Sequence, residues 1–268
     1  MEILKDLSPS ALAVAVEENE AEFLLALGRA GGGEERDDDE IAWTIGGSPI
    51  GYHNCVVRAE LTRERADDEI AASIAAFERF GVAGSWHVGP SMRPSDLGER
   101  LGARGFQGAP EPGMAVDLHA LAPPPPVAGL RVDRVTSPAD LTDYERVLGS
   151  GFGEGPVEAA WVCAMYARIR LDNDAWRHHI GRIDDRAVAT ASVFFAAGVA
   201  GLYFVSTAPE MRRRGIGAAV SYAAMADARD AGYRVGVLGS SPMGHAVYER
   251  LGFREVCEIT VHEWSPRA

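Results

Sequence analysis

One stretch, residues 202–232, limits what this chain can fold into more than any other. It begins with an uncharged apolar run, Leu202 to Val205, which is typical of a strand buried on both faces. Pro209 cannot donate a hydrogen bond to a sheet, so the strand must end near Thr207. Small and apolar residues then recur at helical spacing up to Gly232, a residue type that commonly closes a helix. The stretch therefore predicts a strand, a turn and a helix.

Two glycines, Gly215 and Gly217, lie in the first turn of this helix, which we expect to run from about Arg214 to Ala231. Backbone N–H groups in a first turn have no carbonyl partner, and the helix dipole is positive there. Glycines let an anion come close, and three successive arginines, Arg212 to Arg214, add positive charge. A helix N-terminus, small residues and cations together form a phosphate-binding site, so we expect a phosphorylated ligand here.

The order of residues separates this segment from other phosphate-binding motifs. A P-loop needs a Lys followed by Ser or Thr, and a dinucleotide fold needs G-x-G-x-x-G after the first strand; neither is present. The run from Thr207 to Gly217, TAPEMRRRGIG, resembles the acyl-CoA pyrophosphate motif of the GNAT superfamily of acetyltransferases. Further on, Val237–Ser241 is similar to that family's fifth strand and loop, and Ala246–Phe253 to its final helix and turn. The resemblance covers about residues 130–265.

The resemblance implies that acetyl-CoA, or another acyl-CoA, is the co-substrate and that no metal is needed. In the family, the strand ending here at Thr207 splays from the next one, Arg234–Leu238, and the pantetheine arm of the donor enters the gap. Where many relatives have an Asn, this chain has Ser240–Gly244, in which a serine hydroxyl can still bond the pantetheine or adenine side. The implied donor-binding residues are Val205, Ser206, Thr207, Arg212, Arg213, Arg214, Gly215, Ile216, Gly217, Ala218, Ser241 and Gly244.

The implied catalytic residue is Tyr248, which matches the family's usual phenol. Its ordinary pKa of about 10 is close enough to a thiol's, about 8.5, for it to protonate the departing thiolate. An N–H near Val205 would polarise the thioester carbonyl. Some relatives keep a glutamate at the segment Gly201–Phe204, which has no carboxylate here. Glu154, a His, a bridging water and the C-terminal carboxylate of Ala268 remain open as the general base.

The acceptor pocket of the superfamily is lined by two helices and the loop between them. Here those helices are predicted from a Ser137 cap to about Leu148 and from Val157 to Leu171. Periodicity alone would instead place Trp161 and Met165 in the core. Both interpretations stay open. The residues that the resemblance brings to the substrate are Phe152, Glu154, Trp161, Tyr166 and, on the strand, Tyr203.

The N-terminal half has its own predicted elements. A tract of three glycines followed by acids is interpreted as a solvated, mobile loop, since the acids would repel a phosphate. This loop covers residues 31–40. A helix from Pro9 to Leu27, ended by Gly28, is predicted before it, and the elements predicted after it are strands at Ile41–Ile45 and Pro49–Val57, a helix ending near Gly81, and a strand at Ser85–Val88.

Part of this half parallels the C-terminal half. Leu101–Phe106 followed by a strand at Met114–Leu118 matches Tyr248–Phe253 followed by Ile259–Trp264. The first half is therefore interpreted as a decayed copy of the same fold, with an unrelated α+β lid as the alternative. The predicted class is α+β, in α/β/α layers: two GNAT-like lobes, each a mixed, mostly antiparallel sheet flanked by helices.

The decayed copy is not expected to catalyse. The position matching Tyr248 holds Leu101 or Gly98, and no acyl-CoA motif precedes Pro123. A stiff, donor-free proline run, Pro123–Pro126, is typical of a linker. The predicted domains are 1–122, degenerate and GNAT-like; a linker at 123–128; and 129–268, catalytic.

Composition narrows the partners. A net charge of −13 argues against nucleic acid and favours a cationic amine as acceptor. No apolar run is long enough to cross a bilayer, so a cytoplasmic monomer or homodimer is expected. Cys55, Cys163 and Cys257 are too far apart for a metal motif and are expected as buried free thiols. His178 and His179 are neighbours on one strand, so they should face opposite sides rather than share a metal.

The leading hypothesis is an acyl-CoA-dependent N-acyltransferase that transfers acetyl to a small-molecule amine by direct attack in a ternary complex. The first alternative is a non-catalytic acyl-CoA-binding regulatory module, which the missing base and the decayed first half favour. The second keeps the enzyme but changes the acyl donor, or uses a hydroxyl or thiol acceptor, as a tandem arrangement similar to that of mycothiol synthase allows.

Overall fold

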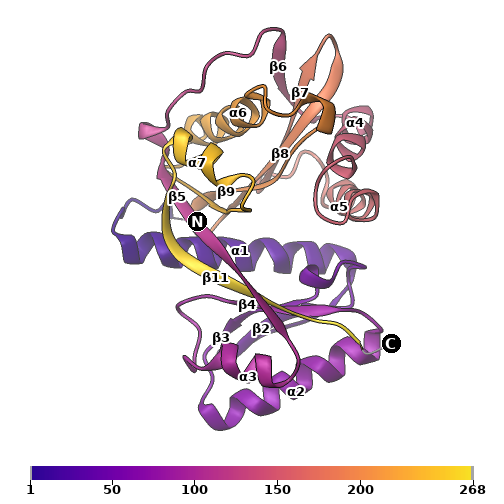
Figure 1. Ribbon diagram of the computed structural model, residues 1–268, viewed down its shortest axis with the longest axis vertical. Helices are drawn as coiled ribbons and strands as arrows, with labels where there is room; N and C mark the ends of the chain where they lie inside the picture. Colours follow the sequence, from indigo (N-terminus) through magenta and orange to yellow (C-terminus); the bar gives the residue numbers. More distant parts are fainter. Residues whose placement is uncertain (1, 267–268) are drawn as a thin grey trace. The chain divides into compact units, whose positions relative to one another are not determined.

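The computed structural model describes residues 2–266, which form two compact units (Figure 1). Unit 1 comprises the described residues up to Asn19 together with Met114–Val256. Unit 2 comprises Glu20–Gly113 and the described residues from Cys257 onward. Three elements have residues in both units: helix α1 (Pro9–Gly31) and strands β5 (Gln107–Asp117) and β11 (Arg254–Trp264).

Unit 1 is built on a mixed sheet in which β7, β8 and β9 form the predicted antiparallel meander. Strand β6 joins β7 antiparallel, and β10 lies parallel to β9. The strand order in this unit is β6-β7-β8-β9-β10-β5. The strands are β6 (Leu130–Arg134), β7 (Trp176–Ile183), β8 (Arg186–Ala196), β9 (Val199–Thr207) and β10 (Val235–Gly239).

Two helix pairs cover the two faces of this sheet (Figure 1). On one face lie α4 (Pro138–Gly149) and α5 (Pro156–Ile169), and on the other α6 (Ile216–Asp230) and α7 (His245–Leu251). Short turns of 3-10 helix, η3 (Pro209–Met211) and η2 (Leu118–Ala120), complete the unit. The core on the α6 face is apolar and includes Val193, Leu202, Val220 and Phe253. The predicted α+β class with sheets flanked by helices is confirmed.

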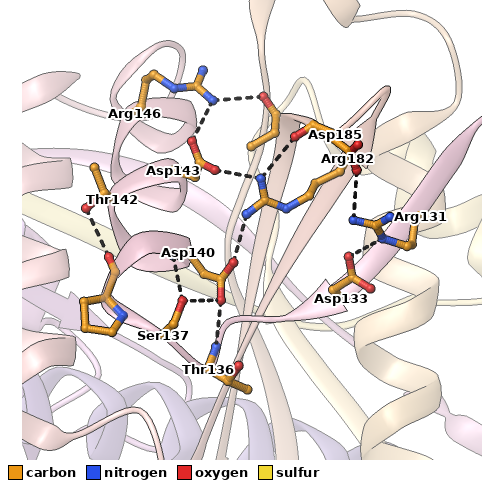
Figure 2. A network of polar contacts seen from close by, with 12 residues as sticks. Arg131, Asp133, Thr136, Ser137, Asp140, Thr142, Asp143, Arg146, Arg182 and Asp185 are labelled. Atoms are coloured by element: carbon orange, nitrogen blue, oxygen red, sulfur yellow. Dashed lines mark hydrogen bonds and ion pairs between the residues drawn. The ribbon is translucent and has the colours of Figure 1, made fainter.

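Ion pairs connect α4 to strand β7 of the sheet (Figure 2). The guanidinium of Arg182, on β7, donates to Asp140 Oδ1 at 2.9 Å and to Asp143 Oδ2 at 2.7 Å. The Arg182 side chain is only 13% exposed, and its contact holds the pKa of Asp143 below its usual range. The Ser137 hydroxyl caps the helix by accepting from the backbone N–H of Asp140 at 3.1 Å. These contacts fix the helix that precedes the 150–155 loop.

Unit 2 is also built on a mixed sheet. Its strand order is β1-β2-β3-β4-β11-β5. Strands β1 to β3 are antiparallel, and β3 runs parallel to β4. The elements are β1 (Glu34–Asp37), β2 (Ile41–Ile45), η1 (Gly51–His53), β3 (Cys55–Ala59), α2 (Arg63–Phe80), β4 (Gly84–Val88) and α3 (Leu97–Ala103). A core that includes Ile70, Phe77 and Trp86 holds them together.

Two predictions about the N-terminal half are wrong. The acidic segment after the glycines is not a mobile loop but strand β1, because its acids are paired: Glu34 with Arg79 and Glu35 with Arg29. Helix α1 does not end at Gly28 but continues to Gly31. Gly28 is there for packing, since a Cβ on it would lie 1.9 Å from Thr44 Oγ1.

Two smaller expectations also change. The strand predicted at Pro49–Val57 is shorter: Gly51–His53 is a 3-10 turn, and the strand runs from Cys55 to Ala59. Here Asn54 holds the turn, since its side-chain amide donates to Ser48 O at 2.9 Å and to Ile50 O at 3.0 Å. Of the three free cysteines, Cys257 is only half-buried, whereas Cys55 and Cys163 are buried as expected.

The compact units do not divide at the proline-rich segment. Residues 123–128 lie inside unit 1, and the boundaries fall after Asn19, Gly113 and Val256. The boundaries at Gly113 and Val256 fall within two long strands. Strand β5 passes from unit 2 into unit 1 and is the neighbour of β10, whereas β11 passes from unit 1 into unit 2 and pairs with β4. The division into two GNAT-like domains joined at 123–128 concerns the evolutionary origin of the two halves. Compactness does not test it, so it stays a prediction.

Candidate active site

The site begins at an irregularity in β9. The pairing of β8 with β9 shifts register between Thr190 and Ser192, and Phe204 takes a φ of 51°, which strains a residue with a side chain. The Thr190 hydroxyl donates to Phe204 O at 2.9 Å and so occupies that carbonyl. A bulge of this kind re-aims the backbone that follows it. Here that backbone is Val205 to Thr207, the predicted donor-binding segment.

Strands β9 and β10 pair only at their beginnings. Their register joins Gly236 to Ala200 and Val237 to Gly201. No pair is recorded among the described residues beyond these, so Val205 and Thr207 lie past the last paired position. The predicted splay between the two strands is therefore present in this unit.

The start of α6 is open. Gly215, with a φ of 80°, precedes the helix without a side-chain cap, and no acidic residue lies in the first turn. A Cβ on Gly217 would lie 3.4 Å from Thr207 Oγ1, so its absence keeps the space between helix and strand free. Arg213 also has a positive φ, 64°, which completes the turn. The geometry is that of a backbone anion site.

The three arginines have different places. Arg212 is a clamp: its Nε donates to Thr207 O at 3.1 Å and its Nη2 to Gly151 O at 2.9 Å. Arg213 is exposed and lines the cleft described next. Arg214 is exposed and lies 3.5 Å from the sulfur of Met211, and it is not among the lining residues.

A cleft of about 450 Å³ joins these features within unit 1. Its lining includes every predicted donor-binding residue except Arg214, and Tyr248 as well. Sequence reasoning missed several lining residues, of which Ser221 could have been found because it lies one helical turn beyond Gly217. The charged residues of the lining are Arg212, Arg213 and Arg250. The missed residues are Gly151, Met211, Ser221, Met243, Ala246, Val247 and Arg250.

Tyr248 lies in α7 and lines the same cleft as the α6 turn. Its ring meets Phe253 edge-on at 5.9 Å between centroids. A Cβ on Gly244 would lie 2.8 Å from a ring carbon of Tyr248, so that glycine makes room for the phenol. Burial raises the pKa of Tyr248 to about 12. The phenol is therefore protonated at any physiological pH.

Two hydroxyls of the lining have no hydrogen-bond partner among the described residues. They are Ser206 Oγ and Ser221 Oγ, and both residues are buried, at 4% and 0% exposure. A buried hydroxyl without a partner costs about 1–3 kcal/mol. Such groups next to a cleft indicate that a ligand supplies the missing partner.

The predicted acceptor residues do not gather in this cleft, because none of them is among its lining residues. Phe152 packs edge-on against Phe204 at 5.4 Å. Glu154 is exposed, and Trp161 is half-buried on α5. The Tyr203 hydroxyl donates to Asn19 Oδ1 at 2.7 Å and so faces α1. Tyr166 is fully buried and bonded to Ser192 Oγ at 3.0 Å, which gives it a core position.

No carboxylate or imidazole is among the cleft-lining residues that the structure describes. Of the open candidates for the base, Ala268 lies outside the described residues. His178 bonds Ser192 Oγ at 2.9 Å, and burial lowers its pKa to about 3. His179 instead contacts Asp227 at 3.1 Å, so the two rings have different partners, as residues on opposite faces of a strand do. Residues 2–266 contain no cluster of three metal-ligating side chains and no helix long and apolar enough to cross a bilayer.

Comparison with known proteins now adds to this geometry. The sequence model of the acetyltransferase (GNAT) family matches residues 143–253, which include β7 to β10, the α6 turn and α7. This segment is a GNAT acetyltransferase domain. The open helix start and the splayed strands of the GNAT domain lie inside the matched range, and so does Tyr248.

Solved structures with the fold of this GNAT domain cover most of the chain. A GCN5-related N-acetyltransferase from Kribbella flavida has a TM-score of 0.73 and 17% identity, over 92% of this chain and 96% of that one. One from Sphaerobacter thermophilus has a TM-score of 0.60 and 18% identity, over 97% and 95%. A tandem GNAT protein from the clavulanic acid biosynthesis pathway has 0.58 and 15%, over 85% and 79%. No curated protein sequence matches the chain.

Proposed function

We propose that this protein is an acyl-CoA-dependent N-acyltransferase, most simply an acetyltransferase that acts on a small-molecule amine in a ternary complex. The observation that carries the proposal is the cleft of the GNAT domain. Its lining combines an uncapped helix start with cationic side chains, the end of β9 and a protonated phenol. An anionic ligand with a long arm and a reactive end fits this arrangement.

The residues present fit such a donor. The backbone N–H groups at Gly215 to Gly217 have neither a side-chain cap nor an acid beside them, so a diphosphate would supply the missing partner. Arg213 adds an exposed positive charge at the same place. Ser206 and Ser221, whose hydroxyls have no partner among the described residues, line the same cleft.

The arm of the donor would enter between β9 and β10, where pairing stops after Gly201 and Val237. Backbone groups of Val205 and Thr207 would pair with it as a neighbouring strand would. The bulge at Phe204 re-aims the following N–H groups, and one near Val205 would stabilise the oxyanion that forms when the amine attacks the thioester carbonyl. Ser241 and Gly244 also line the cleft and would contact the donor.

Tyr248 would protonate the thiolate that leaves. Its pKa of about 12 keeps the proton available, but the transfer is uphill to a thiol of ordinary pKa about 8.5. The same apolar surroundings disfavour the thiolate, which narrows this gap. The role of the chain is thus to hold a neutral phenol beside the departing thiolate.

The general base stays open, because the cleft offers no carboxylate or imidazole among its described residues. An acceptor amine of low pKa would need no base, and a bridging water would serve others. The acidic surface implied by a net charge of −13 favours a cationic acceptor. We also keep the prediction of a cytoplasmic monomer or homodimer that binds no nucleic acid.

The proposal is tested by calorimetric titration with acetyl-CoA, followed by an assay of thiol release against a panel of small amines. We expect binding at micromolar concentrations and turnover with at least one amine. If acetyl-CoA produces neither heat nor a thermal shift, the proposal is wrong.

One second function has an observation in its favour. The lack of a base in the described lining of the cleft suits a non-catalytic acyl-CoA-binding regulatory module. Such a module would bind acetyl-CoA tightly but release no thiol above background with any amine. Competition between acetyl-CoA and longer acyl-CoAs, and assays with hydroxyl and thiol acceptors, would identify a different donor or acceptor.

A further inference from the structure

The stripe of α6 that faces the sheet contains Gly217, Ser221 and Met225, each one turn from the next. Gly217 faces β9, because its Cβ would lie 3.4 Å from Thr207 Oγ1. Met225 faces β10, because its sulfur lies 2.8 Å from the Cβ position of Gly236. Ser221 lies between them, so it faces the place where the two strands separate.

Ser221 is a polar residue in an apolar part of the core. Its neighbours on the buried side of α6 are apolar: Val220, Ala224 and Met225 are all fully buried in the core of unit 1. Ser221 is equally buried, at 0% exposure, and its Oγ has no hydrogen-bond partner among the described residues. An alanine would be a better helix former there and would leave no unsatisfied group.

We propose that Ser221 is a donor-binding residue that recognises an amide of the pantetheine arm. Its hydroxyl can donate to an amide carbonyl or accept from an amide N–H, and the arm of acyl-CoA carries two amides. This rests on the proposed function, since it names the partner within the same cleft. The buried hydroxyl remains unsatisfied in the free protein and gains its partner only when the arm enters between β9 and β10.

The proposal predicts opposite effects on stability and on binding. Ser221→Ala removes an unsatisfied hydroxyl and improves helix propensity, so the free protein should melt about 2 °C higher. The same change should weaken acetyl-CoA binding about fivefold, the size of one net hydrogen bond. Adenosine 3′,5′-bisphosphate carries phosphates and adenine but no pantetheine. Its affinity should change less than twofold, within the usual precision of a titration.

A second buried serine supplies the control. Ser73, on α2, has partners: it donates to Ile70 O at 2.8 Å and accepts from Trp86 Nε1 at 3.0 Å. Ser73→Ala should therefore lower the melting temperature and leave both affinities unchanged. The pair of variants separates a hydroxyl that stabilises the fold from one that binds a ligand.

The experiment is titration of the full-length wild type and both variants with acetyl-CoA and with adenosine 3′,5′-bisphosphate, alongside melting curves without ligand. A selective loss for acetyl-CoA in a Ser221→Ala protein that melts no lower than wild type supports the proposal. Unchanged acetyl-CoA binding, an equal loss for both ligands, or a lowered melting temperature overturns it while the proposed function stands. Failure of the wild type to bind acetyl-CoA overturns both.

Discussion

Helices α2 and α6 have the same place in the topology of the two units, yet their first turns are built differently. Each connects a strand to the next parallel strand, β3 to β4 in unit 2 and β9 to β10 in unit 1. At the start of α2, Thr62 Oγ1 accepts from the backbone N–H of Arg65 at 3.3 Å, and Glu64 is the second residue. At the start of α6 there is no side-chain cap, and the second residue is Gly217.

The difference shows how one topology yields a structural helix and a binding helix. In α2 the chain itself satisfies the first turn. The Thr62 hydroxyl accepts from a free backbone N–H, and the Glu64 carboxylate interacts favourably with the helix dipole. The same groups on α6 are left for an external anion. The choice between the two outcomes rests on a few residues of the first turn and not on the arrangement of strands and helices.

The final helices of the two units, α3 and α7, also have the same topology but different functional residues. In α3, Phe106 N donates to Leu101 O at 3.1 Å, and in α7, Phe253 N donates to Tyr248 O at 3.1 Å. This shared bond makes Leu101, not Gly98, the counterpart of Tyr248. Leu101 is fully buried and has no proton to donate. Unit 2 therefore lacks both the open helix start and the phenol.

The largest effect is expected from making α6 resemble α2. Gly217→Glu places a carboxylate where α2 has Glu64, filling the space beside Thr207 and repelling a diphosphate. Acetyl-CoA binding should weaken at least about 100-fold, or about 2.7 kcal/mol, by calorimetry. Gly102→Glu, in unit 2 where a side chain meets nothing within 4 Å, should bind as wild type does. Retained affinity in Gly217→Glu would contradict the anion site.

Next in size is the loss of the phenol. Tyr248→Phe should slow turnover about 100-fold and change donor affinity little, because only proton transfer is removed. Since the pKa of Tyr248 is about 12, the phenol stays protonated below that pH. If activity declines between pH 8 and 10, the decline should therefore be of about the same size in the variant as in the wild type. A decline present only in the wild type would show that Tyr248 titrates lower.

A smaller effect should separate two neighbouring arginines. Arg213 lines the cleft and Arg214 does not, although both are exposed. Arg213→Gln should weaken acetyl-CoA binding about fivefold at low salt, and the loss should shrink at about 1 M salt. Arg214→Gln is the matched control and should cost less than about twofold. Equal losses would place both guanidiniums at the phosphates.

The smallest effect on binding is expected in unit 2. Thr62→Ala removes the cap of α2 and should cost about 1 kcal/mol of the free energy of unfolding, measured by urea denaturation. Donor affinity should not change, because this helix start serves the fold alone. A reduced affinity for acetyl-CoA would mean that the two helix starts are less different in function than their residues indicate.

Local sequence signals predicted much of the molecule. The helix start at Gly215, the meander of β7 to β9 and the cap at Ser137 all depend on neighbouring residues, and all are present. The failures came from residues whose role is set at long range. Gly28 was interpreted as a helix end, but Thr44 packs against it. The acids after Gly33 suggested a loop, but Glu34 pairs with the distant Arg79 and Glu35 with Arg29 at the end of the preceding helix.

The sequence by itself determined the GNAT resemblance, the phosphate motif and the phenol, because each is written in consecutive residues whose backbone preferences are local. Only the tertiary structure decided that Arg212 clamps the Gly151 loop, that Leu101 replaces the phenol in unit 2, and that the Ser221 hydroxyl is buried without a partner. These facts depend on which segments pack together. Burial and hydrogen bonding between residues distant in the chain leave no local pattern to detect.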